Sequence, residues 1–210
     1  MTRDLIKEHK KKKSEIRERL DEFRAIWRQS DNRVFSELCF CICTPQSRAV
    51  YCDRAVSDLE KSGILFTGGK GRIRPFLKAV RFPNNKAGYI AAARKLFAAS
   101  NKIRIKDRID PDDIFGTRLW FVRNVKGIGL KEASHFLRNV GFGKDLAILD
   151  VHILKNLKAY GVIKEIPKSI TKKEYLRIEN KLRDFCDKIK IPMDELDLLF
   201  WSRETGFVFK

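Results

Sequence analysis

The chain has 210 residues, 43% of them hydrophobic, which is enough to bury a sizeable core as one large domain or two small lobes. Lysine and arginine number 45 against 27 aspartate and glutamate residues, giving a net charge of +18 and a pI near 9.9. This charge favours nucleic acid as the partner, ahead of an anionic membrane surface. No apolar run approaches the roughly 18 residues that cross a bilayer, and no hydrophobic signal region follows the basic cluster Lys7–Lys13. We therefore expect a cytoplasmic protein without a membrane partner.

The apolar pattern predicts a mostly helical chain. From Ile16 to Trp27, large apolar residues recur at spacings of four, three and four, which places them on one face of a helix. Alternation typical of strands is nowhere long, so any strand should be minor. The predicted helices cover residues 3–29, 34–43, a segment ending near 61, 74–81, 84–99, 112–123, a segment after 130, 172–190 and 194–204.

Acidic residues mark several predicted helix starts. The segment from Asp110 to Asp113 supplies a cap and a first-turn acid, Asp150 stands where a helix begins, and Asp194 should cap the last helix. The glycine cluster at 67–71 lacks the spacing of a phosphate-binding loop, so we predict a plain turn there.

The five cysteines are odd in number and are predicted to be buried thiols. Cys39 and Cys43 would share one helical face, so a metal pair is conceivable, but no CxxC spacing or histidine completes a tetrahedral set. Unpaired cysteine behaves as a small hydrophobe, which favours burial over a metal site. The others are Cys41, Cys52 and Cys186.

The segment 125–131, Val-Lys-Gly-Ile-Gly-Leu-Lys, joins two predicted helices as a hairpin. Glycine lets the backbone approach a phosphate, and the following helix presents its positive N-terminus. Lys126, Gly127 and Gly129 are therefore predicted to bind the DNA backbone, a contact that grips DNA without reading its sequence. The alternative is a helix corner whose glycines only permit tight packing, and the net charge favours DNA.

Lys131 follows this hairpin, and Asp150 comes nineteen residues later. A lysine can become a nucleophile where a carboxylate stands nearby. Taken singly, Lys131 is as readily a phosphate contact and Asp150 a helix cap; Asp150 can be both cap and catalyst. Their combination after this hairpin predicts catalysis. His152 is predicted to contact a phosphate or to pack.

These residues resemble the helix-hairpin-helix and aspartate signature of the DNA base-excision glycosylases. Members with lysine at the position of Lys131 remove a damaged base and then cut the strand, so the resemblance implies that Lys131 is the nucleophile. It also implies an all-α, two-lobed fold with DNA in the cleft. The expected lobes are residues 1–72 with 164–210, and a central lobe, 73–163, carrying the hairpin. The matching segments are Gly127-Ile128-Gly129, Lys131, Ala133 and Leu149-Asp150-Val151-His152.

The residue types suit this chemistry. Breaking an N-glycosidic bond builds positive charge on the sugar, which an ionised Asp150 can stabilise. A neutral Lys131 amine attacking C1′ leads to a Schiff base, and elimination of the 3′ phosphate then nicks the strand.

Within the superfamily, the chain is most similar to the archaeal-type 8-oxoguanine DNA glycosylases of the second OGG class. The most telling segment is Trp201-x-x-x-Thr205-Gly206-x-x-x-Lys210. The resemblance implies that Trp201 lines the base pocket and that Lys210 recognises the oxidised guanine; a flipped base needs such stacking and edge contacts. The alternatives are core packing for Trp201 and a frayed tail for Lys210.

Other segments bear on the DNA contacts. Arg81-Phe82 resembles the wedge of this family, whose aromatic ring enters the base stack; a buried core Phe82 is the competing interpretation. Gln46 stands where this class usually has Asn and is similar to endonuclease III-like relatives, which leaves the opposite-base preference open. The iron–sulfur cluster of those relatives is excluded, because only Cys186 lies in the C-terminal region.

The sequence thus predicts a monomeric enzyme that excises 8-oxoguanine from double-stranded DNA and cleaves the strand by β-elimination, with no cofactor and no metal. Two alternatives stay open. One keeps the fold with oxidised pyrimidines as substrates, and the other is a non-catalytic DNA-binding module.

Overall fold

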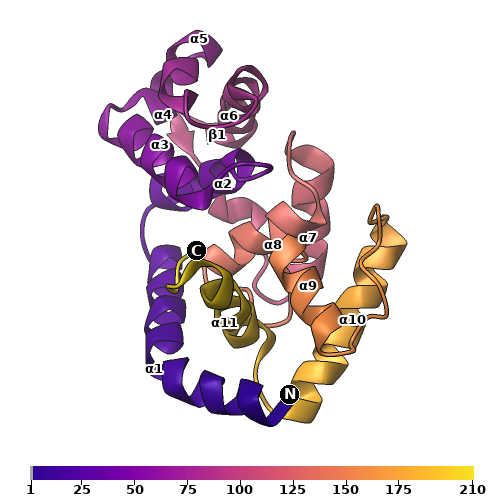
Figure 1. The fold of residues 1–210 in the computed structure, drawn as a ribbon. Coiled ribbons are helices and arrows are strands. Elements are labelled where there is room, and N and C mark those ends of the chain that lie inside the picture. The colour runs from indigo at the N-terminus through magenta and orange to yellow at the C-terminus, as the bar shows by residue number, and fades with distance from the viewer. Residues whose placement is uncertain (1) are drawn as a thin grey trace. The chain divides into compact units, whose positions relative to one another are not determined.

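The computed structural model describes residues 2–210 and is mostly helical (Figure 1), which confirms the all-α prediction. The α-helices are α1 (Thr2–Trp27), α2 (Asp31–Cys43), α3 (Ala49–Lys61), α4 (Ile64–Thr67), α5 (Lys70–Ile73), α6 (Pro83–Phe97), α7 (Ile114–Asn124), α8 (Leu130–Asn139), α9 (Val151–Ala159), α10 (Lys172–Ile189) and α11 (Met193–Thr205). Two 3₁₀ helices, η1 (Arg74–Leu77) and η2 (Lys106–Arg108), and a short antiparallel pair, β1 (Ala98–Ala99) and β2 (Lys102–Ile103), complete the described elements. None of the helices in residues 2–210 has an apolar stretch long enough to cross a bilayer.

The chain forms two compact units. One contains the residues up to Ala25 together with Leu137–Lys210, and the other is Ile26–Phe136. These bounds differ from those of the lobes expected at residues 72 and 164, and the predicted lobe organisation stays a prediction. Helices α1 and α8 each continue across a boundary, so α8 begins in the second unit and ends in the first.

The unit Ile26–Phe136 is built around α2. Every residue of this helix from Val34 to Cys43 is buried, as expected for a helix that neighbours cover on all sides. Helices α3 and α6 pack against it. A second cluster contains the rings of Phe97, Phe121 and Phe136. The centroid of the Phe121 ring lies 5.8 Å from that of Phe97 and 5.0 Å from that of Phe136.

The cysteines are buried thiols, as predicted. Burial raises the pKa of Cys52 to about 11 and that of Cys186 to about 12. These thiols therefore stay protonated and inert near neutral pH, because the thiolate is the reactive form.

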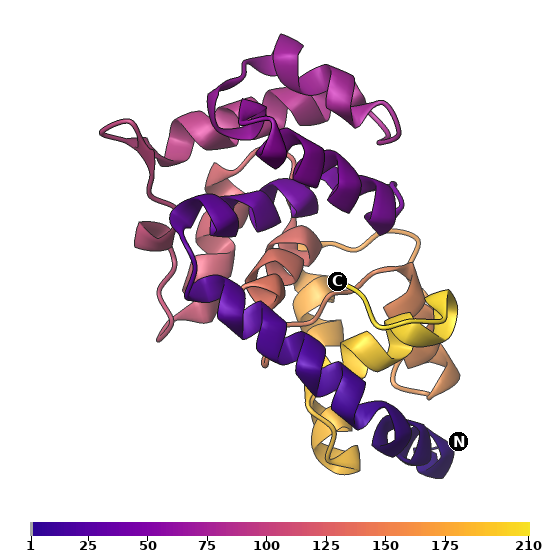
Figure 2. The ribbon, with the colours of Figure 1, turned by 90° about the vertical axis from the view of Figure 1, so that its left-hand side faces the viewer.

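In the other unit, α1 buries Ile16, Leu20 and Phe23 of its predicted apolar face, together with Leu5. Trp27, the last residue of that predicted face, is half-buried. Figure 2 follows this helix along its length. Helix α11 packs on α9 and α10, and the rings of Tyr160 and Phe200 stack with centroids 5.7 Å apart. Buried polar pairs also tie α1 to α11, including the bond between His9 and Glu195.

Three local predictions were wrong. The predicted helix at 74–81 is only the four-residue η1, with a proline in its first turn. Phe82, directly before Pro83, has a left-handed backbone that begins a new helix, α6. The glycine cluster at 67–71 is not a plain turn, because Gly69 precedes the short helix α5. The last helix begins after Pro192, and Asp194 lies within its first turn.

Candidate active site

The predicted hairpin joins α7 to α8 and has the geometry of a tight backbone turn. Gly127 has a φ of +86°, and a Cβ atom there would lie 2.3 Å from the ring of Tyr89 on α6, so only glycine fits. Gly129 has no such strain. Val125 and Ile128 are buried and anchor the turn, while Lys126 is exposed on it. The buried side chains of Val125 and Ile128 thus fix a turn whose glycine backbone and Lys126 side chain are exposed.

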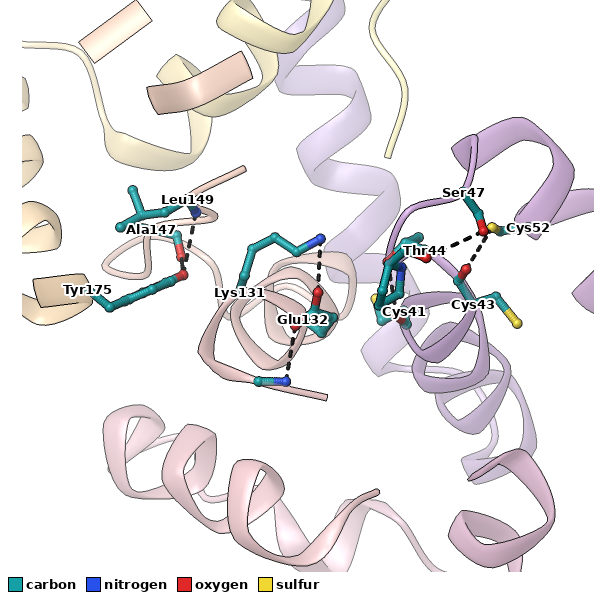
Figure 3. A network of polar contacts seen from close by, with 12 residues as sticks. Cys41, Cys43, Thr44, Ser47, Cys52, Lys131, Glu132, Ala147, Leu149 and Tyr175 are labelled. Carbon is teal, nitrogen blue, oxygen red and sulfur yellow. Dashed lines mark hydrogen bonds and ion pairs between the residues drawn. The ribbon is translucent and has the colours of Figure 1, made fainter. Parts of the chain in front are cut away.

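Lys131 lies in the first turn of α8 and is half-buried, with 24% of its side chain exposed. Its Nζ is 3.0 Å from Oε1 of Glu132 (Figure 3). The other oxygen of Glu132 accepts the N–H of Gly129 at 3.0 Å. This carboxylate, three residues after Gly129, closes the helix start as the glutamate of a capping box does. Sequence reasoning missed Glu132, although its spacing from Gly129 was a usable signal.

Asp150 caps α9, as predicted. Its backbone is extended, with φ −91° and ψ −179°, and its Oδ1 accepts the N–H of Ile153 at 2.8 Å. One oxygen of the carboxylate is thereby fixed against the N-terminus of α9.

The segment leading to Asp150 is held by α10. The hydroxyl of Tyr175 donates to the carbonyl of Ala147 at 2.6 Å and accepts the N–H of Leu149 at 3.4 Å (Figure 3). Glu179, one turn along α10, accepts the N–H of Ala147 at 2.8 Å. Tyr175 and Glu179 therefore hold the backbone of the segment that leads to Asp150. Sequence reasoning missed them because their partners are backbone atoms, which leave no pattern in the sequence.

Asp197 is a buried acid on α11 whose pKa depends in part on Asp150. Burial raises the pKa of Asp197 to about 7; Asp150 and Asp194 add to the rise, and Arg138 opposes it. The Nη1 of Arg138 lies 3.6 Å from Oδ2 of Asp197, too far for a hydrogen bond but close enough for attraction between the charges. Asp197 therefore titrates near neutrality.

His152, on the first turn of α9, lies near an acid. Its Nδ1 is 3.4 Å from Oε2 of Glu204, so a protonated His152 would form an ion pair within its own unit. The predicted contact between His152 and a phosphate stays a prediction.

The predicted wedge is exposed. Phe82 has half of its surface accessible and a left-handed backbone with φ +57°, so the alternative of a buried core phenylalanine is wrong. The guanidinium of Arg81 lies 5.5 Å from the centre of its ring. Gln46 is also exposed, in the turn between α2 and α3, and it too has a left-handed backbone, with φ +56°.

The C-terminal segment forms an aromatic cluster. The ring of Trp201 lies 5.9 Å from that of Phe207 and 6.0 Å from that of Phe209. Val208 is buried, which anchors the tail, and Lys210 is half-buried at its end. The two predicted pocket residues thus belong to one packed segment of the unit that contains Asp150.

Each unit holds part of the predicted site. The unit Ile26–Phe136 carries Gln46, Arg81, Phe82, the hairpin and Lys131, and the other unit carries Asp150, His152, Trp201 and Lys210. Within residues 2–210, no group of three or more histidine, cysteine, aspartate or glutamate side chains converges as the ligands of a metal ion do.

Known proteins that are similar to this chain are 8-oxoguanine DNA glycosylases. A family model described as 8-oxoguanine DNA glycosylase matches residues 16–191. An 8-oxoguanine DNA glycosylase/AP lyase of Fusobacterium nucleatum is 46% identical over 209 residues, which cover 99% of this chain and 96% of that protein.

Two solved structures extend the likeness to the fold. The 8-oxoguanine glycosylase/lyase of Methanocaldococcus jannaschii, crystallised with a 15-mer DNA containing 8-oxoguanine, matches with a TM-score of 0.87 and 37% identity over 98% of this chain and 99% of that one. The 8-oxoguanine DNA glycosylase of Thermotoga maritima matches with a TM-score of 0.85 and 34% identity over the whole of both chains.

The helical fold and the hairpin with its lysine define a DNA glycosylase of the helix-hairpin-helix class. Within this class, the chain belongs to the 8-oxoguanine DNA glycosylase family, in the archaeal-type group of glycosylase/AP lyases. This confirms the resemblance carried by the hairpin, the aspartate and the C-terminal segment.

Proposed function

We propose that the protein excises 8-oxoguanine from double-stranded DNA in base excision repair and then cleaves the strand, with Lys131 as the nucleophile. The observation that carries the proposal is the placement of Lys131: a half-buried amine in the first turn of the helix that follows the phosphate-binding hairpin. Family membership and the DNA complex of the M. jannaschii relative support the same substrate.

The proposed reaction has two stages. The neutral amine of Lys131 bonds to C1′ as the N-glycosidic bond breaks, and the base leaves with the bonding electrons and takes up a proton. The carboxylate of Asp150 stabilises the positive charge that develops on the sugar. Loss of the ring oxygen from C1′ gives the Schiff base, removal of a C2′ proton follows, and the 3′ phosphate departs with the electron pair.

The remaining predicted residues bind the DNA. Lys126 and the hairpin amides of Gly127 and Gly129 hold the backbone, and His152 adds a phosphate contact. Trp201 stacks on the extruded base and Lys210 reads its oxidised edge, since a flipped base needs both an aromatic face and polar contacts. Gln46, Arg81 and Phe82 contact the duplex around the gap.

Borohydride trapping tests the nucleophile. Wild-type protein should be trapped covalently on duplexes that contain 8-oxoguanine, and Lys131→Gln should not. Lys126→Gln, a change of an exposed hairpin lysine, is the matched control and should weaken binding while retaining trapping. Efficient trapping by Lys131→Gln would refute the assignment. A thymine glycol duplex run in parallel detects specificity for oxidised pyrimidines, and salt-sensitive binding without any product would indicate a non-catalytic module.

A further inference from the structure

Two exposed residues of the unit Ile26–Phe136 hold a backbone conformation that side chains disfavour. Gln46 and Phe82 have φ values of +56° and +57°. The other positive-φ residues with side chains in the described chain lie where local structure explains them, at the turn between β1 and β2 or at the C-terminal cap of α10. Strained conformations persist where the surrounding structure holds them, and they gather at functional sites.

A buried lysine holds the turn that contains Gln46. Lys86, on α6, is only 4% exposed. Its Nζ donates to the carbonyls of Cys43 and Pro45 at 2.6 and 2.7 Å and to the hydroxyl of Ser47 at 3.0 Å. All three N–H groups of the ammonium thus have acceptors. Burial lowers the pKa of Lys86, which marks the cost of placing a charge there, and that cost is offset by these bonds at the negative end of α2.

Ser47 carries the connection on to the wedge. Its Oγ, which accepts from Lys86, also accepts the N–H of Arg81 at 3.0 Å. Arg81 directly precedes Phe82, whose left-handed backbone turns the chain into α6. Figure 3 shows Ser47 beside Cys52 and close to the end of α2. A single hydroxyl therefore joins the turn of Gln46 to the turn of Phe82.

We propose that Lys86 and Ser47 are positioning residues that fix Gln46 and Phe82 as one rigid pair for insertion into DNA. The inference rests on the proposed function, because it assigns a role to this network in extruding the damaged base. Extrusion leaves a gap in the stack that inserted side chains must fill as a unit. A preformed abasic site has no base to unstack, so its cleavage depends less on the alignment of the pair.

Ser47 gives the sharpest test, because Lys86→Met would leave buried carbonyls without a donor and impair folding. Ser47→Ala removes the hydroxyl, and Ser47→Thr keeps it. The control is Ser62→Ala, since Ser62 is an exposed serine of the same unit whose hydroxyl donates to the carbonyl of Leu59 at the end of α3. Single-turnover excision of 8-oxoguanine opposite each of the four bases is compared with cleavage at a preformed abasic site.

Ser47→Ala should slow excision about tenfold, the loss expected for one hydrogen bond at a transition state, while abasic-site cleavage changes less than about twofold on the same scale. Discrimination between opposite bases should relax, and the amide of Arg81 should exchange hydrogen faster. Ser47→Thr should restore all three, and Ser62→Ala should match wild type. Equal loss of both activities, or unchanged excision and exchange in Ser47→Ala, would overturn the inference. Failure of wild type to excise 8-oxoguanine would instead refute the proposed function.

Discussion

The carboxylate of Glu132 lies 3.0 Å from the Nζ of Lys131, the proposed nucleophile. This ion pair engages the amine, which must leave the carboxylate before it can bond to C1′ of a sugar. The same carboxylate accepts the N–H of Gly129 at 3.0 Å, so it also stabilises the start of α8. Glu132 therefore couples the fold of the hairpin to the position of the Lys131 amine.

Replacing Glu132 by glutamine separates these two effects. Glutamine keeps an oxygen for the N–H of Gly129 but removes the charge beside Lys131. Abasic-site cleavage should become about threefold faster, because the amine no longer has to leave an ion pair, and the gain is modest because the pair is partly solvated. Glu132→Ala is the control and should lose about 1 kcal/mol of stability with the cap. An identical cleavage rate in wild type and Glu132→Gln would show that this carboxylate does not restrain the amine.

The two hairpin glycines should respond differently to alanine. Gly127→Ala combines a φ of +86° with a Cβ only 2.3 Å from the ring of Tyr89, and should cost about 2–4 kcal/mol. Gly129→Ala meets only the carboxylate of Glu132 at 3.4 Å, an ordinary contact, and should cost about 1 kcal/mol. Urea unfolding measures both, and salt-dependent DNA binding shows whether the hairpin survives. Equal losses would mean that Tyr89 moves aside.

Tyr175 should matter for both stability and catalysis. Tyr175→Phe leaves the buried carbonyl of Ala147 without its 2.6 Å donor, a loss of about 1–2 kcal/mol. The segment that ends at Asp150 should then loosen, so 8-oxoguanine excision should slow more than DNA binding weakens. Tyr51→Phe, at an exposed tyrosine of α3, is the matched control and should leave unfolding and excision unchanged. Loss of stability with full excision would limit Tyr175 to a role in folding.

Local contacts of the site could be predicted from the sequence, whereas the long-range contacts that support it could not. The start of α8 at Gly129 and the cap at Asp150 are local, because each depends on a hydrogen bond between residues three positions apart. The bonds from Tyr175 to Ala147 and from Lys86 to Cys43 join residues 28 and 43 positions apart. Such contacts depend on how helices pack and use backbone atoms common to every residue, so no spacing in the sequence indicates them.

Asp197 should make the stability of the protein depend on pH. Its pKa is raised from 3.8 to about 7 in the folded protein, chiefly by burial. Between about pH 4 and pH 7, Asp197 is therefore protonated in the folded state but has lost its proton in the unfolded state. Its contribution to stability is complete below about pH 4 and is lost as the pH rises to 7, by at most about 4 kcal/mol at 1.36 kcal/mol per pKa unit.

Asp197→Asn should remove this dependence. The side-chain amide of asparagine does not titrate. The unfolding free energy of the variant should therefore rise relative to that of wild type from pH 4 to pH 7. The absolute value includes the lost attraction to Arg138, 3.6 Å away, so the slope with pH is the decisive quantity. Urea unfolding across this range measures it, with Asp184→Asn on the exposed face of α10 as the control. Parallel curves for wild type and Asp197→Asn would mean that Asp197 stays ionised in the folded protein, with Arg138 outweighing the burial.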